Sequence, residues 1–204
     1  MAPYAVGHLK MASLSEESHF AGKVKKETPI LVILGNPPYS GISANASEKF
    51  IIIKTKHERE KRRTIKTRIG NLIETYKDID GSHSGEKKHW LHDDYVKFIR
   101  FAQWKIDNEG EGVLGFITNH SYLDNPTFRG MRQSLMKSFN EIHILDLHGN
   151  SLKKEKCPDG SKDENVFDIQ QGVAIALFIK KKSKKKAGRI HHSEIWGLRE
   201  RKNK

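Results

Sequence analysis

The chain has 204 residues, of which 36% are apolar and 30% charged, and 37 Lys and Arg against 25 Asp and Glu give a net charge of +12. This length suits one domain or most of one. No apolar run approaches the roughly 20 residues that cross a bilayer. The first ten residues lack a secretory signal pattern, and the single Cys157 excludes a disulfide framework and a Cys-based zinc site, so we expect a cytoplasmic protein.

The positive charge favours a nucleic-acid partner, although a solvated basic surface is a common alternative. Along the chain, Ala5, Leu9 and Ala12 recur at helical steps and predict a short helix within residues 2–13. Residues 14–28 are mostly polar and predict a connection. The following run ILVIL at residues 30–34 is β-branched and too short for a helix, which predicts a buried strand of a parallel sheet.

An Asn-Pro-Pro-Tyr tetrapeptide, Asn36 to Tyr39, follows this strand directly after Gly35. Two consecutive prolines remove two backbone donors and fix φ, so the tetrapeptide is expected to form a stiff, extended loop. Such a loop would leave the carboxyl end of the strand, where open α/β sheets place their ligand sites.

The residue types of this loop suit the binding of a flipped adenine. The Asn oxygen and a Pro carbonyl are two acceptors, fixed in space, for the two hydrogens of an exocyclic amine. The Tyr ring offers a flat surface on which a base can stack. An enzyme that flips an adenine out of DNA and methylates its N6 needs this combination. A chance turn is the alternative interpretation, and the preceding strand makes it the weaker one.

The next segments predict elements that pack around the sheet. Residues 49–68, which include KTKHEREKRRTIKTR, predict a helix or a mobile arm with alternating charge, either a solvated face or a phosphate contact. Residues 69–76 predict a short helix and residues 78–88 a turn-rich loop. In residues 90–108 an apolar stripe at helical spacing predicts a long helix that packs on the sheet.

The second half of the chain contains three more apolar strands. Residues 113–118 predict a strand parallel to the first, because a helix-length segment separates the two. A helix capped by Asn125-Pro126 comes next. Residues 141–147 and 172–179 predict strands that pair antiparallel across a hydrophilic loop. A last strand is expected in residues 189–196, after a run of lysines.

Asn119 and Tyr122 follow the second strand and are candidate wall residues of the binding cleft. An equally good interpretation is that they belong to an ordinary polar loop. His120 between them is expected to satisfy a local backbone group. The alternation of strands and helices from the NPPY tetrapeptide onward predicts an α/β fold.

Longer stretches of the chain resemble a known family. GNPPYSG, GVLGFITNHSYLDNPTFRGMRQSL, ILDLHGN and ENVFDIQQGVAIALFIKK are similar to the methyltransferase region of type ISP single-chain restriction-modification enzymes. In these, a nuclease, a translocase, an N6-adenine methyltransferase and a target recognition domain share one polypeptide. The resemblance extends from about residue 2 to residue 196. It implies a Rossmann-like methyltransferase fold with parallel strands and a terminal antiparallel strand.

The resemblance also implies roles for individual residues. Asn36 and the Pro37 carbonyl would hold the adenine N6 amine, Pro38 would stiffen the loop, and Tyr39 would stack on the base. Phe167 would cover the other face of the base. The methyl donor would be S-adenosylmethionine and the partner double-stranded DNA, and the transfer needs no metal. The Gly-rich turn with which such enzymes bind the donor is missing upstream of the first strand, so no cofactor-binding residue is assigned.

The missing turn predicts that residues 1–196 are a partial methyltransferase domain, followed by a basic tail at residues 197–204. On this interpretation the chain is a fragment, and the donor-binding half, the translocase and the target recognition region are candidate partners. One rival function is a non-catalytic basic module that binds nucleic acid or a partner subunit. The other is a metal-dependent nuclease, in which Asp78 or Asp80 would act with Glu86 and Lys88. Nuclease sites place Glu-x-Lys on a strand, whereas this one lies in a Gly/Ser-rich loop.

Overall fold

A computed structural model describes most of the chain and divides it into two units, residues 1–30 and residues 31–204. The residues described are 16–23, 28–38, 41, 43–54, 60–83, 85, 89–182 and 188–204, of which residue 54 is described in its backbone alone. In the first unit, residues 16–23 are helical, where the sequence predicted a connection. The helix predicted within residues 2–13 lies outside the described residues.

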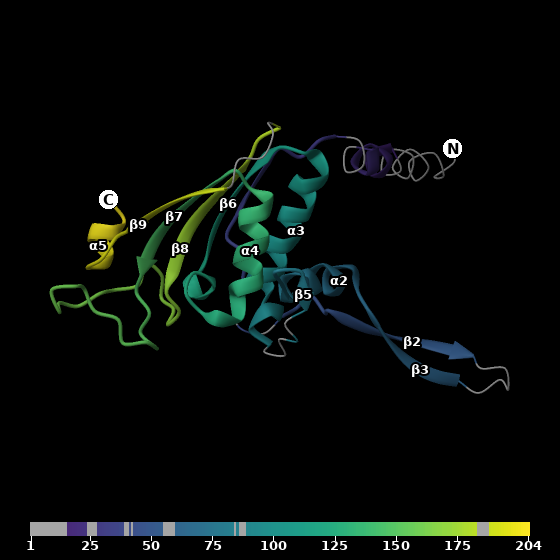
Figure 1. The fold of residues 1–204 in the computed structure, drawn as a ribbon, viewed down its shortest axis with the longest axis horizontal. Coiled ribbons are helices and arrows are strands. Elements are labelled where there is room, and N and C mark those ends of the chain that lie inside the picture. Colours follow the sequence, from purple (N-terminus) through teal and green to yellow (C-terminus); the bar gives the residue numbers. More distant parts are fainter. Residues whose placement is uncertain are drawn as a thin grey trace, which may run out of the picture. The chain divides into compact units, whose positions relative to one another are not determined.

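The second unit is built on a five-stranded mixed sheet with the order β1-β6-β8-β7-β9 (Figure 1). Its strands are β1 (Val32–Gly35), β6 (Gly112–Asn119), β7 (Glu141–His148), β8 (Val173–Lys180) and β9 (Arg189–Glu194). β1 pairs parallel with β6, and β7 pairs parallel with β9. β8 lies antiparallel between β6 and β7, so four of the five strands run in one direction. All five strands were predicted, and the architecture is compatible with a Rossmann-like fold.

One prediction about the first strand was wrong. β1 is an edge strand, and Val32 and Leu34 are 58% and 69% exposed. An apolar run that ends in Gly-Asn-Pro-Pro indicates a strand, but it does not reveal whether other segments cover that strand on both sides.

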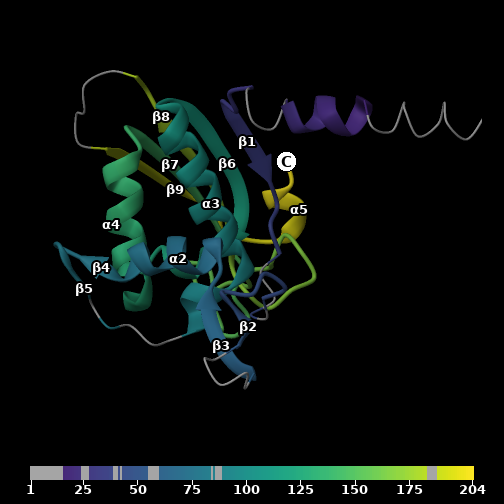
Figure 2. The same cartoon turned by 90° about the vertical axis from the view of Figure 1, so that its right-hand side faces the viewer.

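Two helices cover one face of the sheet (Figure 2). They are α3 (Asp94–Glu109), which begins after the 3-10 turn η2 (His89–His92), and α4 (Arg129–Ser138), which begins after η4 (Pro126–Phe128). A short 3-10 turn, η3 (His120–Tyr122), follows β6. The core lies between these helices and the sheet, where Ile99, Leu114 and Phe178 are at most 1% exposed. Among the described residues, no helix is long and apolar enough to cross a membrane.

The segment predicted as a helix or mobile arm is a β-hairpin. β2 (Glu48–Lys54) and β3 (Glu60–Lys66) pair antiparallel and project away from the sheet (Figure 1). The hairpin leads into α2 (Arg68–Glu74) and η1 (Thr75–Lys77), and a small hairpin of β4 (Asp78–Ile79) and β5 (Ser82–His83) follows. Cross-strand contacts such as that of the Arg62 guanidinium, 3.6 Å from the centre of the Phe50 ring, stabilise the ribbon.

The last residues contain helix α5 (Arg199–Lys202), within the segment predicted as a basic tail. Lys202 is buried and pairs with Asp163 at 2.6 Å, and its amine also donates to the carbonyls of Leu147 and Glu164. Helix α5 is therefore attached both to the end of β7 and to the loop that follows it.

Candidate functional site

The Asn-Pro-Pro sequence leaves the carboxyl end of β1 beside the carboxyl end of β6, because Gly35 pairs in register with Phe116. Asn36 is exposed, and its side chain has no hydrogen bond with any residue that the structure describes. Pro37 is buried and Pro38 is exposed. Tyr39 lies outside the described residues. The carboxamide oxygen of Asn36 is thus free to accept a hydrogen bond at the edge of the sheet where the sequence predicted a binding site.

The chain that follows this loop is fixed to the beginning of α3. The Asp94 carboxylate accepts hydrogen bonds from Ser43 Oγ at 2.5 Å, the Ala44 backbone N–H at 3.0 Å and Asn45 Nδ2 at 3.2 Å. Burial raises the pKa of Asp94, but these donors lower it more, so the pKa lies below its ordinary value. Lys97 donates to Ser43 Oγ at 2.6 Å and to the Asn45 carbonyl. Residues 43–45 are therefore fixed to the first turn of α3.

A cavity of about 350 Å³ lies among Gly41, the beginning of α3 and the residues that follow β6. Its lining includes Gly41, Asn119 and the aromatic residues Trp90, Tyr95 and Phe128. Asn119 is mostly buried, and its side-chain oxygen accepts from the Ser121 N–H at 2.8 Å. Pockets of this size with aromatic walls and a few polar groups are typical ligand sites.

Two buried polar atoms in the lining of this cavity lack partners among the described residues. They are one carboxylate oxygen of Asp93 and the hydroxyl of Tyr95. Burial raises the pKa of Asp93, and backbone N–H groups only partly offset that effect. An unpartnered buried polar atom costs free energy, so a ligand that supplied a donor to Asp93 would be stabilised. The sequence analysis missed both residues, since they precede and begin a helix that was interpreted only as packing.

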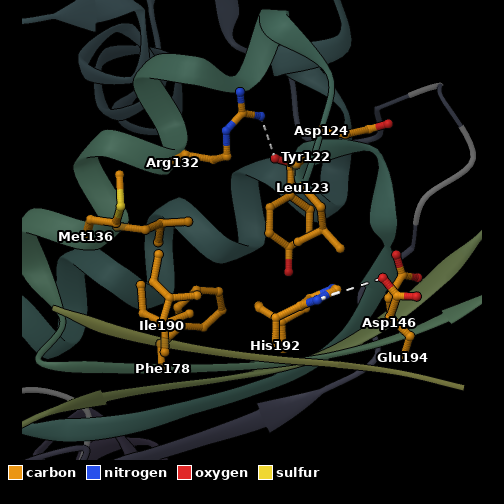
Figure 3. A pocket seen from close by; sticks show the side chains of 13 residues that line it. Tyr122, Leu123, Asp124, Arg132, Met136, Asp146, Phe178, Ile190, His192 and Glu194 are labelled. Carbon is orange, nitrogen blue, oxygen red and sulfur yellow. Dashed lines mark hydrogen bonds and ion pairs between the residues drawn. The ribbon is translucent and has the colours of Figure 1, made fainter.

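The other predicted wall residues lie in different cavities. Tyr122 is buried and lines a cavity of about 450 Å³ between α4 and strands β7 and β9 (Figure 3). Its backbone carbonyl accepts from Arg132 at 2.8 Å. Phe167 is half-buried in the loop between β7 and β8, and it lines a third cavity with Arg199. Of Asn119, Tyr122 and Phe167, only Asn119 lines the same cavity as Gly41, which follows the motif.

The β2–β3 hairpin carries most of the exposed basic residues near this edge. Lys49, Lys61, Arg62, Arg63 and Lys66 are all exposed. The Glu-Lys-Lys part of the possible nuclease site, residues 86–88, lies outside the described residues. Asp78 Oδ1, which belongs to that predicted site, lies 3.0 Å from His83 Nδ1.

Comparisons with known proteins find similar segments in solved DNA complexes. No protein-family model and no curated protein matches the chain. Sixteen chains of solved structures match it. Among them are the ATP-dependent Type ISP restriction-modification enzyme LlaBIII bound to DNA, with 32% identity and a TM-score of 0.64; the DrdV–DNA complex, with 28% and 0.64; and a nuclease-deletion mutant of the Type ISP restriction-modification enzyme LlaGI in complex with a DNA substrate mimic, with 26% and 0.60.

These matches cover 87, 88 and 85% of this chain but 11, 16 and 15% of the respective solved chains. The chain therefore spans a small part of each of these proteins. Over most of its length it is similar to one segment of a protein in each of three DNA complexes, two of which contain type ISP restriction-modification enzymes.

Proposed function

We propose that this chain is the part of a restriction-modification enzyme that binds the target adenine for N6 methylation, with S-adenosylmethionine as the methyl donor. The observation that carries the proposal is the position of Asn36-Pro37-Pro38 at the carboxyl end of β1, with the Asn36 side chain exposed and without a hydrogen bond among the described residues. The similarity to segments of DNA-bound restriction-modification enzymes supports it.

The chemistry follows from the free carboxamide of Asn36. The lone pair of the adenine N6 amine is delocalised into the ring, which makes the amine a poor nucleophile. The Asn36 oxygen and the Pro37 carbonyl would accept its two hydrogens and favour the pyramidal, more nucleophilic form. The two prolines restrict the backbone of the loop, so the amine would be positioned with little cost of reorganisation.

The described residues do not form a complete site for the donor. No Gly-rich turn precedes β1, and β1 is the edge of the sheet, with Val32 and Leu34 exposed. We therefore assign donor binding to residues outside this chain's sheet, which would pair with β1 or pack on its exposed face. S-adenosylmethionine supplies an electrophilic methyl group, and this chain would hold only the acceptor.

DNA is the proposed partner for a second reason, the basic hairpin. The β2–β3 hairpin projects away from the sheet (Figure 1), and its Lys49, Lys61, Arg62, Arg63 and Lys66 are exposed, so they would be able to contact phosphates. The same hairpin is the observation that favours the alternative function, a non-catalytic basic module that binds nucleic acid. Such a module would use the hairpin and would not require Asn36.

The test is a chimaera in which this chain replaces the matching segment of the type ISP enzyme LlaBIII. N6-methyladenine formed in unmethylated DNA is measured by mass spectrometry. We expect methylation by the chimaera and a loss of at least about a hundredfold with Asn36→Ala, the usual cost of removing one preorganised polar group at a reacting atom.

Asn71→Ala is the matched control, because Asn71 is exposed in α2 and far in sequence from the motif. It should leave methylation unchanged. Equal methylation by the Asn36→Ala and Asn71→Ala chimaeras would contradict the assignment. A chimaera that binds DNA with unchanged affinity but forms no N6-methyladenine would favour the non-catalytic module.

A further inference from the structure

A buried cluster of histidine and carboxylate side chains lies where three strands end. His120 comes from η3 after β6, while Asp146 and His148 come from the end of β7. Their ligand atoms all lie within 4.8 Å of one another, and all three residues are buried. Glu155 lies near the cluster in the loop after β7. Glu194 lies near it at the end of β9, and Figure 3 shows it beside Asp146.

An irregularity in β7 creates this arrangement. The register with β8 shifts between Asp146 and His148, and His148 has a φ of 51°, in the left-handed region that non-glycine residues seldom adopt. The turn lets the His148 backbone N–H donate to Asp146 Oδ1 at 2.9 Å. Backbone strain of this kind is frequent at functional sites.

His120 has partners on both ring nitrogens. Asn150 Nδ2 is a donor and lies 3.1 Å from His120 Nε2, so Nε2 accepts and Nδ1 carries the hydrogen. Nδ1 then donates to Asp146 Oδ1 at 3.0 Å. Hydrogen bonds between side chains alone thus account for His120, and they correct the expectation that it satisfies a backbone group.

His148 differs, because neither of its ring nitrogens has a hydrogen-bond partner among the described residues although the residue is only 8% exposed. Nδ1 lies 3.8 Å from Asp146 Oδ2 and 3.8 Å from Glu155 Oε2. Nε2 lies 3.6 Å from Glu194 Oε2. Trp196 stacks on the ring, with 3.3 Å between centroids, and keeps it in place. Two unpartnered buried nitrogens facing carboxylates require an explanation.

We propose that this cluster binds a divalent transition-metal ion, with zinc as the best fit, through His120 Nδ1, Asp146 and His148 Nδ1, with the fourth position left to a water molecule. On binding, the hydrogen of the His120 ring moves from Nδ1 to Nε2, which gives up its hydrogen bond from Asn150 and faces Glu155 Oε1 at 3.9 Å. In a tetrahedral site with bonds of about 2.1 Å, neighbouring donor atoms are about 3.4 Å apart. The separations of 3.3 Å between His120 Nδ1 and Asp146 Oδ2, and of 3.8 Å between His148 Nδ1 and Asp146 Oδ2, are close to that value. Imidazole and carboxylate donors suit zinc.

Glu194 strengthens the assignment. If His148 binds the ion through Nδ1, its Nε2–H points to the Glu194 carboxylate. Metal-bound histidines usually donate their second N–H to such a carboxylate, which fixes the ring and raises its basicity. The cluster therefore provides both the ligands and an outer acceptor.

The ion would join η3, which follows β6, to the end of β7. The inference does not depend on the proposed methyltransferase function, because metal binding is measured without DNA or methyl donor.

The test is calorimetric titration of the full chain, after treatment with a chelator, with Zn²⁺ alone. We expect one ion per chain, a rise in melting temperature with Zn²⁺, and, with Co²⁺ in its place, the visible absorption of a tetrahedral site. His148→Ala should abolish all three. Because the His148 side chain makes no hydrogen bond, circular dichroism should show that the variant is folded. Glu194→Gln, at a partly exposed position, should weaken binding about tenfold.

Exposed histidines provide the control. His143 and His191 stack at 4.5 Å on neighbouring strands and could bind Zn²⁺ adventitiously. The double variant His143→Ala/His191→Ala should keep the one-to-one site. Zinc binding that survives His148→Ala, or that is lost in the double variant, would overturn the proposal. So would the absence of one-to-one binding to the folded chain, and the cluster would then be a network of hydrogen bonds alone.

Discussion

Both faces of the five-stranded sheet carry apolar side chains on β1, β6 and β8, but they differ in how far these side chains are buried. On the face under α3 and α4, Leu114 and Phe178 are at most 1% exposed. On the other face Leu34 and Leu177 are 69% and 41% exposed, and they lie on either side of Gly115. The same kind of side chain therefore contributes to stability on one face and is left to solvent on the other.

This difference indicates which contacts determine the fold of the second unit. The helices and one face of the sheet form a complete core on their own. The open face and the free edge of β1 have the composition of a surface that another segment covers, since isolated apolar residues are normal on a surface but a contiguous set is not. Three predictions test this distinction, beginning with the largest expected effect.

Matched leucine truncations should separate the faces most clearly. Leu114→Ala should lower the free energy of unfolding by about 2 to 5 kcal/mol, because it leaves a cavity in the core. Leu34→Ala, on the neighbouring strand but exposed, should cost less than about 1 kcal/mol. Urea denaturation of both variants measures the two values, and similar losses would mean that the open face is buried in solution.

Two glycines allow the reverse test, in which a methyl group is added. A Cβ on Gly130 in α4 would lie 2.1 Å from the Tyr76 carbonyl, a backbone atom that cannot move away, so Gly130→Ala should destabilise by about 2 kcal/mol. A Cβ on Gly115 would meet only the ends of the Leu34 and Leu177 side chains, at 2.7 and 2.8 Å. These can rotate into solvent, so Gly115→Ala should cost under about 1 kcal/mol.

Thermal melting followed by circular dichroism compares the two glycine variants. A larger loss for Gly115→Ala than for Gly130→Ala would contradict the prediction that the open face can rearrange.

The covered side also contains a charge whose contribution depends on pH. The pKa of Asp94 is lowered in the folded chain. Its hydrogen bonds from residues 43–45 therefore stabilise the fold fully at pH values above 3.8, the ordinary pKa of the carboxyl group. That contribution is lost as pH falls through the lower, folded value. Asp94→Asn should therefore cost about 1 to 2 kcal/mol at pH 7. The difference from wild type should shrink below about pH 4.

Urea titrations at several pH values measure this effect. Asp124→Asn is the control, because Asp124 pairs with Lys153 at an exposed position and should matter much less. A constant difference between Asp94→Asn and wild type down to pH 2 would show that the carboxylate charge is not the cause.

The strands of the sheet could be predicted because each is a short apolar run bounded by glycine, proline or polar residues. The β2–β3 hairpin could not be predicted in the same way. Its second strand, β3 with the sequence EKRRTIK, is mostly charged and exposed. It forms a strand because it pairs with the apolar residues 50–53 of β2. Charge alternation favoured a helix, whereas the β-branched residues at positions 51–53 were the available signal for a strand.

The candidate site shows the same limit. The position of Asn36 after a strand was predictable, because sequence neighbours determine it. Asp93 and Tyr95 line the cavity because α3 begins beside residues 43–45. This contact joins residues about fifty positions apart in the sequence. Likewise, the meeting of His120 with His148 depends on the register of β6, β8 and β7, and single-sequence patterns contain no information about it.

The strand order has a consequence for the way the chain folds during synthesis. β6 and β7 share no hydrogen bond, because β8, which is made later than both, lies between them. As the chain leaves the ribosome, α3, β6, α4 and β7 emerge before residues 173–180, which link the two parallel pairs. Contacts so distant in sequence form slowly. During translation, the edges of β6 and β7 that pair with β8 therefore remain without hydrogen-bond partners. In this interval the nascent chain is accessible to aggregation and to chaperones.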